Sequence, residues 1–525
     1  MRYFILLSVL FLFCGSVLAQ KAPCRFAPQF DTTTLLSDPS ARDRYLRYVM
    51  HYEGMFGDVG MSKITGLTYD GTGIDYKTGA PASPLHYWTA ASKESIQLML
   101  LARALYGDSY AQIFFSEGEV LTPAQVDSKV LTILETKMTT FERWNSAFPG
   151  FGGFLPWVDN NASGVVPMPA WTNSVPALDN GEMIWALYSC EVSASLRTDS
   201  RALTLAHRLR QYLRLLATTA PVVFYAGNGH IRAVTTIKDP FSAPVASNYG
   251  MDCDGQPSSN CYLDDPYEGE LFAVFMDLYS HWPNATARDD VWIAKRAKLQ
   301  RVEYSTPSGP ITVQRGWWFS SHEQWKYLEL PYLAASPTNR RVFMNGERAR
   351  TQHSASLKVP GLYASVTDVC PPGQLPPTYI SATGIQSIAF EPVLRRDVVT
   401  PYGAFPVMLA DLGIGLAWYN MMLQGSSMQG PLGSTEATNV EGTMISPVVT
   451  WDSKITSVVA MLNGVSDIVQ RGLIRDKTFA RFASVIEREW SRVFPEMKGE
   501  EIPLALPAAS IPHTPQLGDF LTCHL

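Results

Sequence analysis

Two kinds of helical pattern alternate along the chain. Residues 183–190 and 271–279 are apolar at nearly every position, which predicts helices buried on all sides. In 199–218 and 477–494 the apolar residues form one stripe and charged residues occupy the opposite face, as in helices that cover a core. A buried helix followed by an amphipathic one, repeated, predicts a mainly α fold with an inner and an outer ring of helices. The segments with helical periodicity are 41–55, 92–107, 122–146, 179–196, 199–218, 267–282, 407–423, 451–470 and 477–494.

Short β-like segments lie between the helices. Residues 222–226 and 231–237 flank Gly227-Asn228-Gly229, a pattern that predicts a β-hairpin. Three further stretches are rich in β-branched residues and turns, and we interpret them as strands or long loops that decorate the helical core: 300–319, 341–365 and 377–398.

The N-terminus has the pattern of a secretory signal. Arg2 supplies a positive charge, residues 4–13 are apolar, and Val17-Leu18-Ala19 is a small-residue cleavage site. The apolar run is too short to span a bilayer, and no later segment reaches about 18 uninterrupted apolar residues. We therefore expect residues 1–19 to be a signal peptide and 20–525 to form a single secreted, extracellular catalytic domain, since no linker interrupts the helical pattern.

The overall composition excludes some partners. Apolar residues make up 46% of the chain and charged residues only 17%, so a large core is possible. The formal net charge is −6 and there is no basic block, which argues against a nucleic-acid partner. No CxxC motif or ligand-spaced histidines occur, so we expect no metal and no cofactor.

The cysteines fit an oxidising compartment. Cys14 lies in the signal, and the six others suggest disulfides, with 15 possible pairings. The spacing suits Cys253–Cys261 as a small loop and Cys24–Cys523 as a link between the termini, whereas Cys190, inside a helical pattern, suits a buried free thiol. Two sequons, at Asn161 and Asn284, agree with glycosylation of an exported chain.

The most acidic stretch runs from Asp264 to Glu270 and packs four carboxylates into seven residues, just before a buried helix. Its structural interpretation is a capping box, with Asp265 as the N-cap, Pro266 at the first position and Glu268 at the third. The residues alone favour this interpretation for Glu268 over a catalytic role. The two interpretations are compatible, however, because inner helices that start at one end of a barrel would bring their N-terminal acids into one cleft.

A second acid, Asp452, lies at the start of another buried helix beside an aromatic residue. Inverting glycosidases need one carboxylic acid to protonate the leaving oxygen and one carboxylate to activate water. A helix N-terminus lowers the pKa of a carboxyl, whereas burial and neighbouring acids raise it. The sequence does not decide which effect prevails for Glu268.

Aromatic and polar clusters supply candidate sugar contacts, although ordinary core packing is the alternative for each one. They comprise the Gly-rich stretch 151–157, the block 317–326, the Gly-rich loop 425–433 and the acids near the helix starts. The candidate substrate-binding residues are Trp157, Glu182, Tyr267, Glu270, Trp317, Trp318, His322, Glu323, Trp325, Lys326, Glu436 and Trp451.

Three of these motifs, taken in order, resemble the eukaryotic endo-β-1,2-glucanases of glycoside hydrolase family 162: 267–271, 317–326 and 450–452. The resemblance implies an (α/α)6 barrel and metal-free, endo-acting, anomer-inverting hydrolysis of β-1,2-glucan to short oligosaccharides. By position, Glu268 matches the general acid and Asp452 the general base, which in that family is thought to act through a substrate hydroxyl and water. Glu270 is the local alternative to Glu268.

Two other functions remain as alternatives. One is a polysaccharide lyase on a helical barrel, which would use a Tyr or His base. The other is a secreted, non-catalytic glycan-binding protein. In each case we expect a monomer whose partner is a polysaccharide, with no membrane association.

Overall fold

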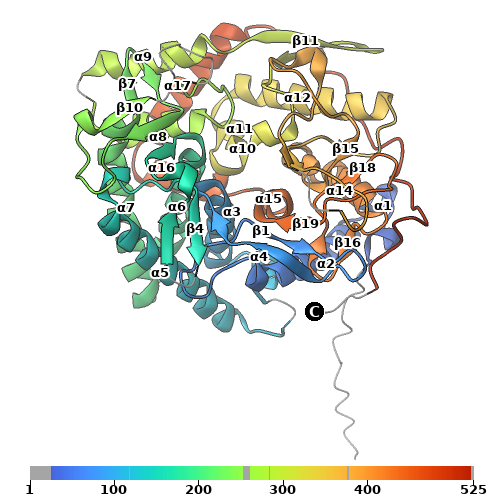
Figure 1. The fold of residues 1–525 in the computed structure, drawn as a ribbon. Coiled ribbons are helices and arrows are strands. Elements are labelled where there is room, and N and C mark those ends of the chain that lie inside the picture. The colour runs from blue at the N-terminus through green and yellow to red at the C-terminus, as the bar shows by residue number, and fades with distance from the viewer. Residues whose placement is uncertain are drawn as a thin grey trace, which may run out of the picture.

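Helices arranged in two concentric rings dominate the structure (Figure 1). The structure is a computed structural model that describes residues 25–116, 119–161, 164–251, 261–282, 284–374 and 378–521. The expected signal segment 1–19 and three disulfide candidates, Cys24, Cys253 and Cys523, lie outside these residues. Within them, no helix is both long and apolar enough to cross a membrane.

The inner ring consists of helices that are buried along most of their length. In α3 every residue from Ala91 to Leu105 is buried, and in α15 all residues are. Around the ring, α15 packs against α3, α3 against α6, α6 against α8, and α13 against both α10 and α15. The inner helices are α3 (Ala91–Tyr106), α6 (Leu178–Ser195), α8 (Glu270–Tyr279), α10 (Lys326–Glu329), α13 (Phe405–Ala410) and α15 (Trp451–Met461).

The outer ring consists of helices most of which bury one face. The last helix of the chain, α17, packs against α8 and α12 and completes this ring. Its buried residues recur on one side, at Phe482, Val485, Ile486 and Trp490. The outer helices are α2 (Pro39–Val59), α5 (Pro123–Ala147), α7 (Ser200–Phe224), α12 (Pro337–Ser356), α14 (Leu412–Leu423) and α17 (Phe479–Val493). The two rings confirm the (α/α)6 barrel.

The remaining elements are short helices and strands that pack around the two rings. The other α-helices are α1 (Thr32–Ser37), α4 (Ser109–Ser116), α9 (Ala285–Arg296), α11 (Tyr332–Ala335) and α16 (Ser466–Arg475). Three-stranded antiparallel sheets are formed by β19 (Val448–Thr450), β1 (Gly71–Ile74) and β2 (Pro81–His86); by β10 (Tyr249–Met251), β9 (Val234–Ile237) and β6 (Ser174–Pro176); and by β3 (Trp88–Thr89), β4 (Val158–Asn161) and β5 (Gly164–Pro167). Paired strands are β7 (Tyr225–Gly227) with β8 (His230–Ile231), β11 (Arg301–Thr306) with β12 (Gly309–Gln314), β13 (Val366–Thr367) with β14 (Tyr379–Ile380), β15 (Val398–Val399) with β18 (Thr438–Asn439), and β16 (Gln429–Gly430) with β17 (Gly433–Ser434).

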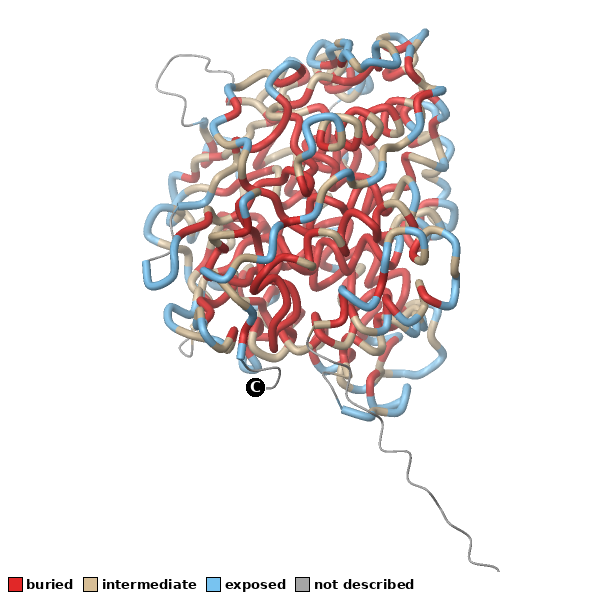
Figure 2. The backbone as a smooth tube through the Cα atoms, turned by 90° about the vertical axis from the view of Figure 1, so that its right-hand side faces the viewer, coloured by how far each residue is buried: buried red, intermediate tan, exposed pale blue. Residues whose placement is uncertain are grey.

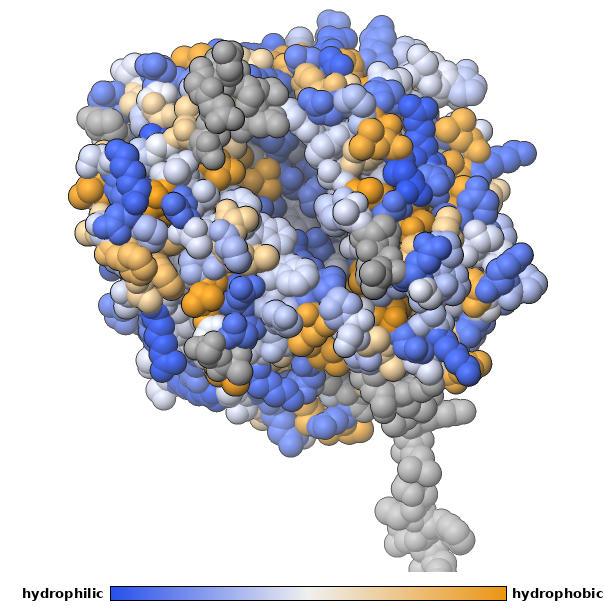
Figure 3. Space-filling view, viewed as in Figure 1, coloured by the Kyte–Doolittle hydropathy of each residue, from blue (hydrophilic) through white to orange (hydrophobic). Residues whose placement is uncertain are grey.

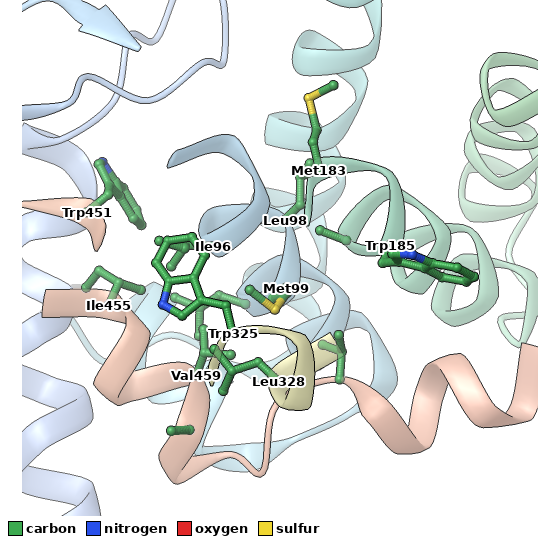
Figure 4. Packing of buried hydrophobic residues seen from close by; sticks show 14 of the residues in the cluster. Ile96, Leu98, Met99, Met183, Trp185, Trp325, Leu328, Trp451, Ile455 and Val459 are labelled. Atoms are coloured by element: carbon green, nitrogen blue, oxygen red, sulfur yellow. The ribbon is translucent and has the colours of Figure 1, made fainter. Parts of the chain in front are cut away.

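The core fills the space inside and between the rings. Figure 2 shows the buried stretches gathered in the interior and the exposed ones at the periphery. Close to the axis, Met99 of α3, Leu328 of α10 and Val459 of α15 lie near one another (Figure 4). These side chains are completely buried. The apolar runs in the sequence therefore correspond to helices with protein on every side.

Deeply buried ion pairs link several of the described helices. Lys137 of α5 pairs with Glu94 of α3, Lys454 of α15 with Glu53 of α2, and Lys326 of α10 with Glu270 of α8. Each of these side chains is almost inaccessible to solvent. A buried charge is tolerated only when it is paired and hydrogen-bonded, so each pair fixes the position of one helix relative to another.

Several predicted boundaries were wrong. The expected helix 451–470 ends at Met461, because Asn463 and Gly464 adopt positive φ angles of 64° and 62°. A Cβ on Gly464 would lie 2.1 Å from the carbonyl oxygen of Leu328, so only glycine fits there. Residues 341–356, expected as strands or loops, belong to α12. This helix buries Asn345, Glu347 and Arg350, so its sequence lacks an apolar stripe.

The predicted hairpin is confirmed at its turn but not over its full length. Tyr225 pairs with Ile231 and Gly227 with His230, whereas residues 222–224 end α7 and 234–237 join another sheet. The expected strands within 300–319 are confirmed as the β11–β12 hairpin. Most of 378–398 is irregular.

The capping box predicted for residues 265–268 was wrong. Helix α8 begins only at Glu270, with Gly269 at its N-cap, and Asp265 Oδ2 accepts a 2.7 Å hydrogen bond from the Gly269 amide. Glu268 therefore lies in the turn before the helix.

The predicted free thiol at Cys190 is confirmed, and Cys370 is also a buried free thiol. Cys261 is in a disulfide whose partner lies outside the described residues.

Candidate active site

A cavity of about 700 Å³ opens where the inner helices α3, α6 and α15 begin. The face seen in Figure 1 is hollowed near its middle in the space-filling view (Figure 3). Because these helices start at the same end of the barrel, their first turns meet here, as the sequence suggested. The lining residues are Asp70, Pro84, His86, Trp88, Ser92, Lys93, Trp157, Leu178, Asp179, Glu182, His322, Trp325, Thr367, Tyr379, Thr450 and Asp452.

Asp452 is held as an ionised carboxylate in the first turn of α15. Its Oδ2 accepts a 3.1 Å hydrogen bond from Lys93 Nζ, and its Oδ1 accepts from the Thr450 hydroxyl at 2.7 Å and the Ser453 amide at 3.1 Å. Burial alone raises the pKa of Asp452, but Lys93 and Thr450 outweigh burial, so this pKa lies below its usual value. Asp452 is thus ready to accept a proton.

Lys93 connects Asp452 to Asp70 and Trp157. Its Nζ lies 3.8 Å from Asp70 Oδ1 and 4.7 Å from the ring centre of Trp157. Asp70 reaches this position because the next residue, Gly71 of β1, pairs with Thr450 of β19. Burial lowers the pKa of Lys93, but Asp452 and Asp70 more than compensate, and the pKa is raised. The ammonium ion therefore stays charged.

Aromatic rings supply apolar faces on the cavity wall. His86 stacks on Trp88, with ring centres 4.5 Å apart and planes 13° from parallel, and His86 Nδ1 lies 3.1 Å from Asp70 Oδ2. Trp157 and Trp325 line the same space. Flat faces beside fixed polar groups suit a sugar ring, which has apolar C–H faces and hydroxyl groups on its rim.

Glu268 lies next to the cavity in a buried position. Its Oε1 is 3.8 Å from Nε2 of His322, a lining residue, and its Oε2 has no hydrogen-bond partner in the described part of the chain. Burial raises the pKa of Glu268 well above its usual value, and the carboxyls of Asp265 and Glu323 raise it further. Glu268 therefore holds a proton where Asp452 does not.

His322 is a neutral neighbour of Glu268. Burial lowers the pKa of His322 to about 4, and its Nδ1 lies 2.8 Å from the hydroxyl of Tyr402. A neutral imidazole next to Glu268 adds no positive charge, so it does not favour the ionised carboxylate.

Glu182 is a second acid with a raised pKa. It comes from the first turns of α6, lines the cavity and is 1% exposed. Burial raises its pKa well above the usual value, and Glu268 and Asp179 add to the effect. Its Oε2 also has no partner among the described residues. The cavity thus contains a rival to Glu268 that the sequence analysis treated only as a binding residue.

The structure brings some candidate binding residues to the cavity and not others. Trp157, Glu182, His322 and Trp325 line it. The rest lie in the surrounding protein. The rings of Trp317 and Trp318 lie beside each other, and the Glu323 carboxylate accepts hydrogen bonds from the backbone amides of both. The Tyr267 hydroxyl donates to the Gln314 carbonyl, Glu270 is paired with Lys326, Glu436 accepts from the Thr367 amide and the Thr450 hydroxyl, and the Trp451 indole donates to the Gly60 carbonyl.

Other cavity residues were missed by the sequence analysis, namely Asp70, His86, Trp88, Lys93 and Tyr379. One signal was present. A lysine in the first turn of a buried helix is unfavourable, because the helix dipole is positive there and burial penalises the charge. Lys93 therefore indicated that acids from elsewhere in the chain face this helix start.

The glycosylation candidates lie away from the cavity lining. Asn161 ends β4, and Asn284 is exposed and caps α9 by accepting a 2.8 Å hydrogen bond from the Ala287 amide. In the described ranges, no group of three or more His, Cys, Asp or Glu side chains has the geometry to hold a metal ion.

Comparison with protein families and solved structures gives a consistent result. A family model described as endo-β-1,2-glucanase SGL, of glycoside hydrolase family 162, matches residues 67–524. No curated protein sequence gives a significant match.

Two structures of an endo-β-1,2-glucanase from Talaromyces funiculosus each superpose with a TM-score of 0.90. One is a glutamate-to-glutamine mutant with β-1,2-glucan, 40% identical over 95% of this chain and 99% of that chain. The other, with sophorose, is 39% identical over 96% and 100%. An endo-β-1,2-glucanase from Chitinophaga pinensis has the same fold at 12% identity, with a TM-score of 0.55 over 86% of this chain and 97% of that chain.

Proposed function

Since the chain belongs to glycoside hydrolase family 162, the family of the endo-β-1,2-glucanase SGL, we propose that it cleaves internal linkages of β-1,2-glucan with inversion at the anomeric carbon. The products are short oligosaccharides. The observation that carries the proposal is the opposite protonation of two acids at one cavity, Glu268 holding its proton and Asp452 ionised. A carboxyl with a raised pKa can donate a proton as the general acid, and a carboxyl with a lowered pKa can accept one as the general base.

Glu268 is the general acid in this proposal. Its buried Oε2–H donates to the glycosidic oxygen as the bond to the anomeric carbon breaks, and the leaving sugar departs as an alcohol. The shift in its pKa comes mainly from burial, so a substrate that displaces water from the cavity keeps the acid protonated until the reaction.

Asp452 is the general base. It receives the proton released when water attacks the anomeric carbon from the opposite face, and the family resemblance implies that this proton passes through a substrate hydroxyl. Lys93 supports this role, because its charge stabilises the carboxylate before the proton arrives. Trp88 and Trp157, which are partly exposed, supply faces against which glucose units can stack.

Incubation with a panel of β-1,2-, β-1,3- and β-1,4-glucans tests the proposal. We expect short oligosaccharides from the β-1,2-glucan alone, with α-configured reducing ends appearing first in NMR spectra. Glu268→Gln and Asp452→Asn each lower the rate by about 10²-fold or more while retaining binding, since a general acid or base contributes about 10²–10⁴-fold. The surface variant Glu303→Gln is the matched control. Retention of more than a tenth of the rate by Glu268→Gln would exclude Glu268 as the acid.

The same experiment separates the alternative functions. A polysaccharide lyase would give products with a new double bond and ultraviolet absorbance. A non-catalytic binding protein would bind β-glucan without producing reducing ends. We also propose that the chain is exported through its N-terminal signal and acts as a monomer, which N-terminal sequencing of the secreted protein and light scattering would test.

A further inference from the structure

One hydroxyl group lies between two buried carboxyl groups beside the cavity. Thr450 Oγ1 is 2.7 Å from Asp452 Oδ1 and 2.9 Å from Glu436 Oε2. The exposed fraction is 6% for Asp452, 4% for Thr450 and 1% for Glu436. Thr450 ends β19 and Asp452 follows two residues later in α15, while Glu436 comes from the segment before β18.

Counting hydrogens favours a proton on one of the two carboxyls in this arrangement. A hydroxyl has one hydrogen to donate, and an ionised carboxylate can only accept. If Thr450 donates its hydrogen to one carboxylate, its oxygen faces an oxygen of the other carboxylate with no hydrogen between them, and the lone pairs of the two oxygens repel. Ser453 Oγ lies 2.6 Å from Thr450 Oγ1 and is also hydrogen-bonded to Glu436, so its single hydrogen serves only one of these contacts and the contact between Thr450 and Glu436 still lacks one. One of the two acids therefore carries a proton.

The surroundings assign that proton to Glu436. Asp452 accepts from the Lys93 ammonium group and the Ser453 amide, which both favour its ionised form. Glu436 Oε1 accepts a 2.8 Å hydrogen bond from the Thr367 amide, which leaves Oε2 as the oxygen that bears hydrogen. Burial and the charge of Asp452 raise the pKa of Glu436 to about 7.

We propose that Glu436 is a positioning residue that donates its proton to Thr450 Oγ1, so that Thr450 directs its own hydrogen to Asp452 and holds that carboxylate ionised and correctly oriented. The catalytic consequence rests on the proposed function, whereas the location of the proton does not. Glu436 acts on Asp452 through the Thr450 hydroxyl and does not itself contact the substrate.

Other charged and titratable groups also act on Asp452, so the test must isolate the hydroxyl link. They come from several elements, including the 3₁₀-helices 321–324 and 401–404: Lys93, Asp179, His322, Tyr379 and Tyr402. Asp70 contacts Lys93, and Lys454 acts on Glu436. Thr450→Val removes the hydroxyl and leaves these groups in place, and Thr450→Ser restores it.

Infrared difference spectroscopy locates the proton directly. We expect the spectrum of the wild type minus that of Glu436→Gln, recorded at pH 5.5, to show the carbonyl stretching band of a protonated carboxyl. A carboxylate band instead would overturn the proposal. This measurement needs no activity, so it remains decisive even if the protein fails to cleave β-1,2-glucan, a result that would refute the proposed function alone.

Kinetics on β-1,2-glucan test the positioning role. We expect Glu436→Ala, which removes the proton donor, to lower kcat about tenfold. We expect Glu436→Gln to retain most of the activity, because its side-chain amide can accept from the Thr367 amide and donate to Thr450 Oγ1 as the protonated acid does. Thr450→Val removes the hydrogen bond to the Asp452 carboxylate, so the pKa of Asp452 rises and the midpoint of the acid limb of kcat rises by about 1 pH unit. Thr450→Ser keeps the hydroxyl and should leave the midpoint at the wild-type value. Equal loss of kcat in Glu436→Gln and Glu436→Ala, or an acid limb unmoved in Thr450→Val, would contradict the proposal.

Discussion

Glu270 Oε2 and Lys326 Nζ lie 2.9 Å apart in the core and join the inner helices α8 and α10. The same carboxylate accepts from the Tyr332 hydroxyl at 3.0 Å and from Trp490 Nε1 at 3.2 Å. Burial lowers the pKa of Lys326, although Glu270 opposes this effect. The group is therefore fully bonded within the barrel wall, and its contacts account for Glu270 as a structural residue.

Breaking this pair should destabilise the barrel strongly. Lys326→Met leaves the Glu270 charge buried without its cation, which costs about 3–5 kcal/mol of unfolding free energy. Lys498→Met removes an exposed ion pair with Glu303 and should cost at most about 1 kcal/mol. Urea denaturation of both variants measures the difference, and similar losses in the two would contradict the buried-pair explanation.

The two acids with raised pKa values should respond differently to amide substitution. Glu268→Gln removes the proposed proton donor, whereas Glu182→Gln keeps a polar lining group and should reduce kcat by less than about tenfold. Rates on β-1,2-glucan, with circular dichroism to confirm folding, separate the two. A larger loss in Glu182→Gln than in Glu268→Gln would transfer the acid role to Glu182.

Removing the cation beside Asp452 should shift the pH dependence of activity. Lys93 lowers the pKa of Asp452, so Lys93→Met raises that pKa and the base becomes protonated at a higher pH. The acid-limb midpoint of kcat should therefore rise by about 1 pH unit or more, since one unit corresponds to about 1.4 kcal/mol of charge interaction. Lys498→Met is the control, and a midpoint that stays at the wild-type value would exclude the interaction.

Stability should fall as the pH rises from about 5 to 7. Burial raises the pKa of Glu323, Glu347 and Glu436 to about 7, so in this range the folded protein holds protons that the unfolded chain, with ordinary carboxyl pKa values near 4.5, has already lost. The stabilisation is complete below about 4.5 and is lost as the pH passes 7. Melting temperatures across this range measure the effect, and Glu436→Gln should show a shallower decline because it removes one of these groups.

The ring architecture was predictable because it depends on local apolar patterns. Residues 271–279 and 183–190 indicated buried helices, and both belong to the inner ring. Helix α12 was missed because polar residues such as Asn345 and Arg350 occupy its buried face. The break after Met461 depends on the Leu328 carbonyl, which comes from a distant part of the sequence.

The site was only partly predictable, for a related reason. Asp452 was identifiable because the sequence around it marks a buried helix start. Its partners Lys93 and Asp70 come from distant segments that meet through the pairing of β1 with β19. Glu323 and Lys326, expected at the substrate, instead bond to a loop backbone and a buried acid. Residue type and local order do not reveal which side of an inner helix faces the cavity.

The position of α17 also constrains how the polypeptide acquires its shape. This segment occupies the wall beside α8 and α12, and Arg296 of α9 donates to its Glu489 at 2.6 Å. The wall next to helices translated earlier thus stays open until α17 has been synthesised. Closure of the barrel consequently waits for α17, and removal of residues 479–493 would leave apolar surface of α8 exposed to water.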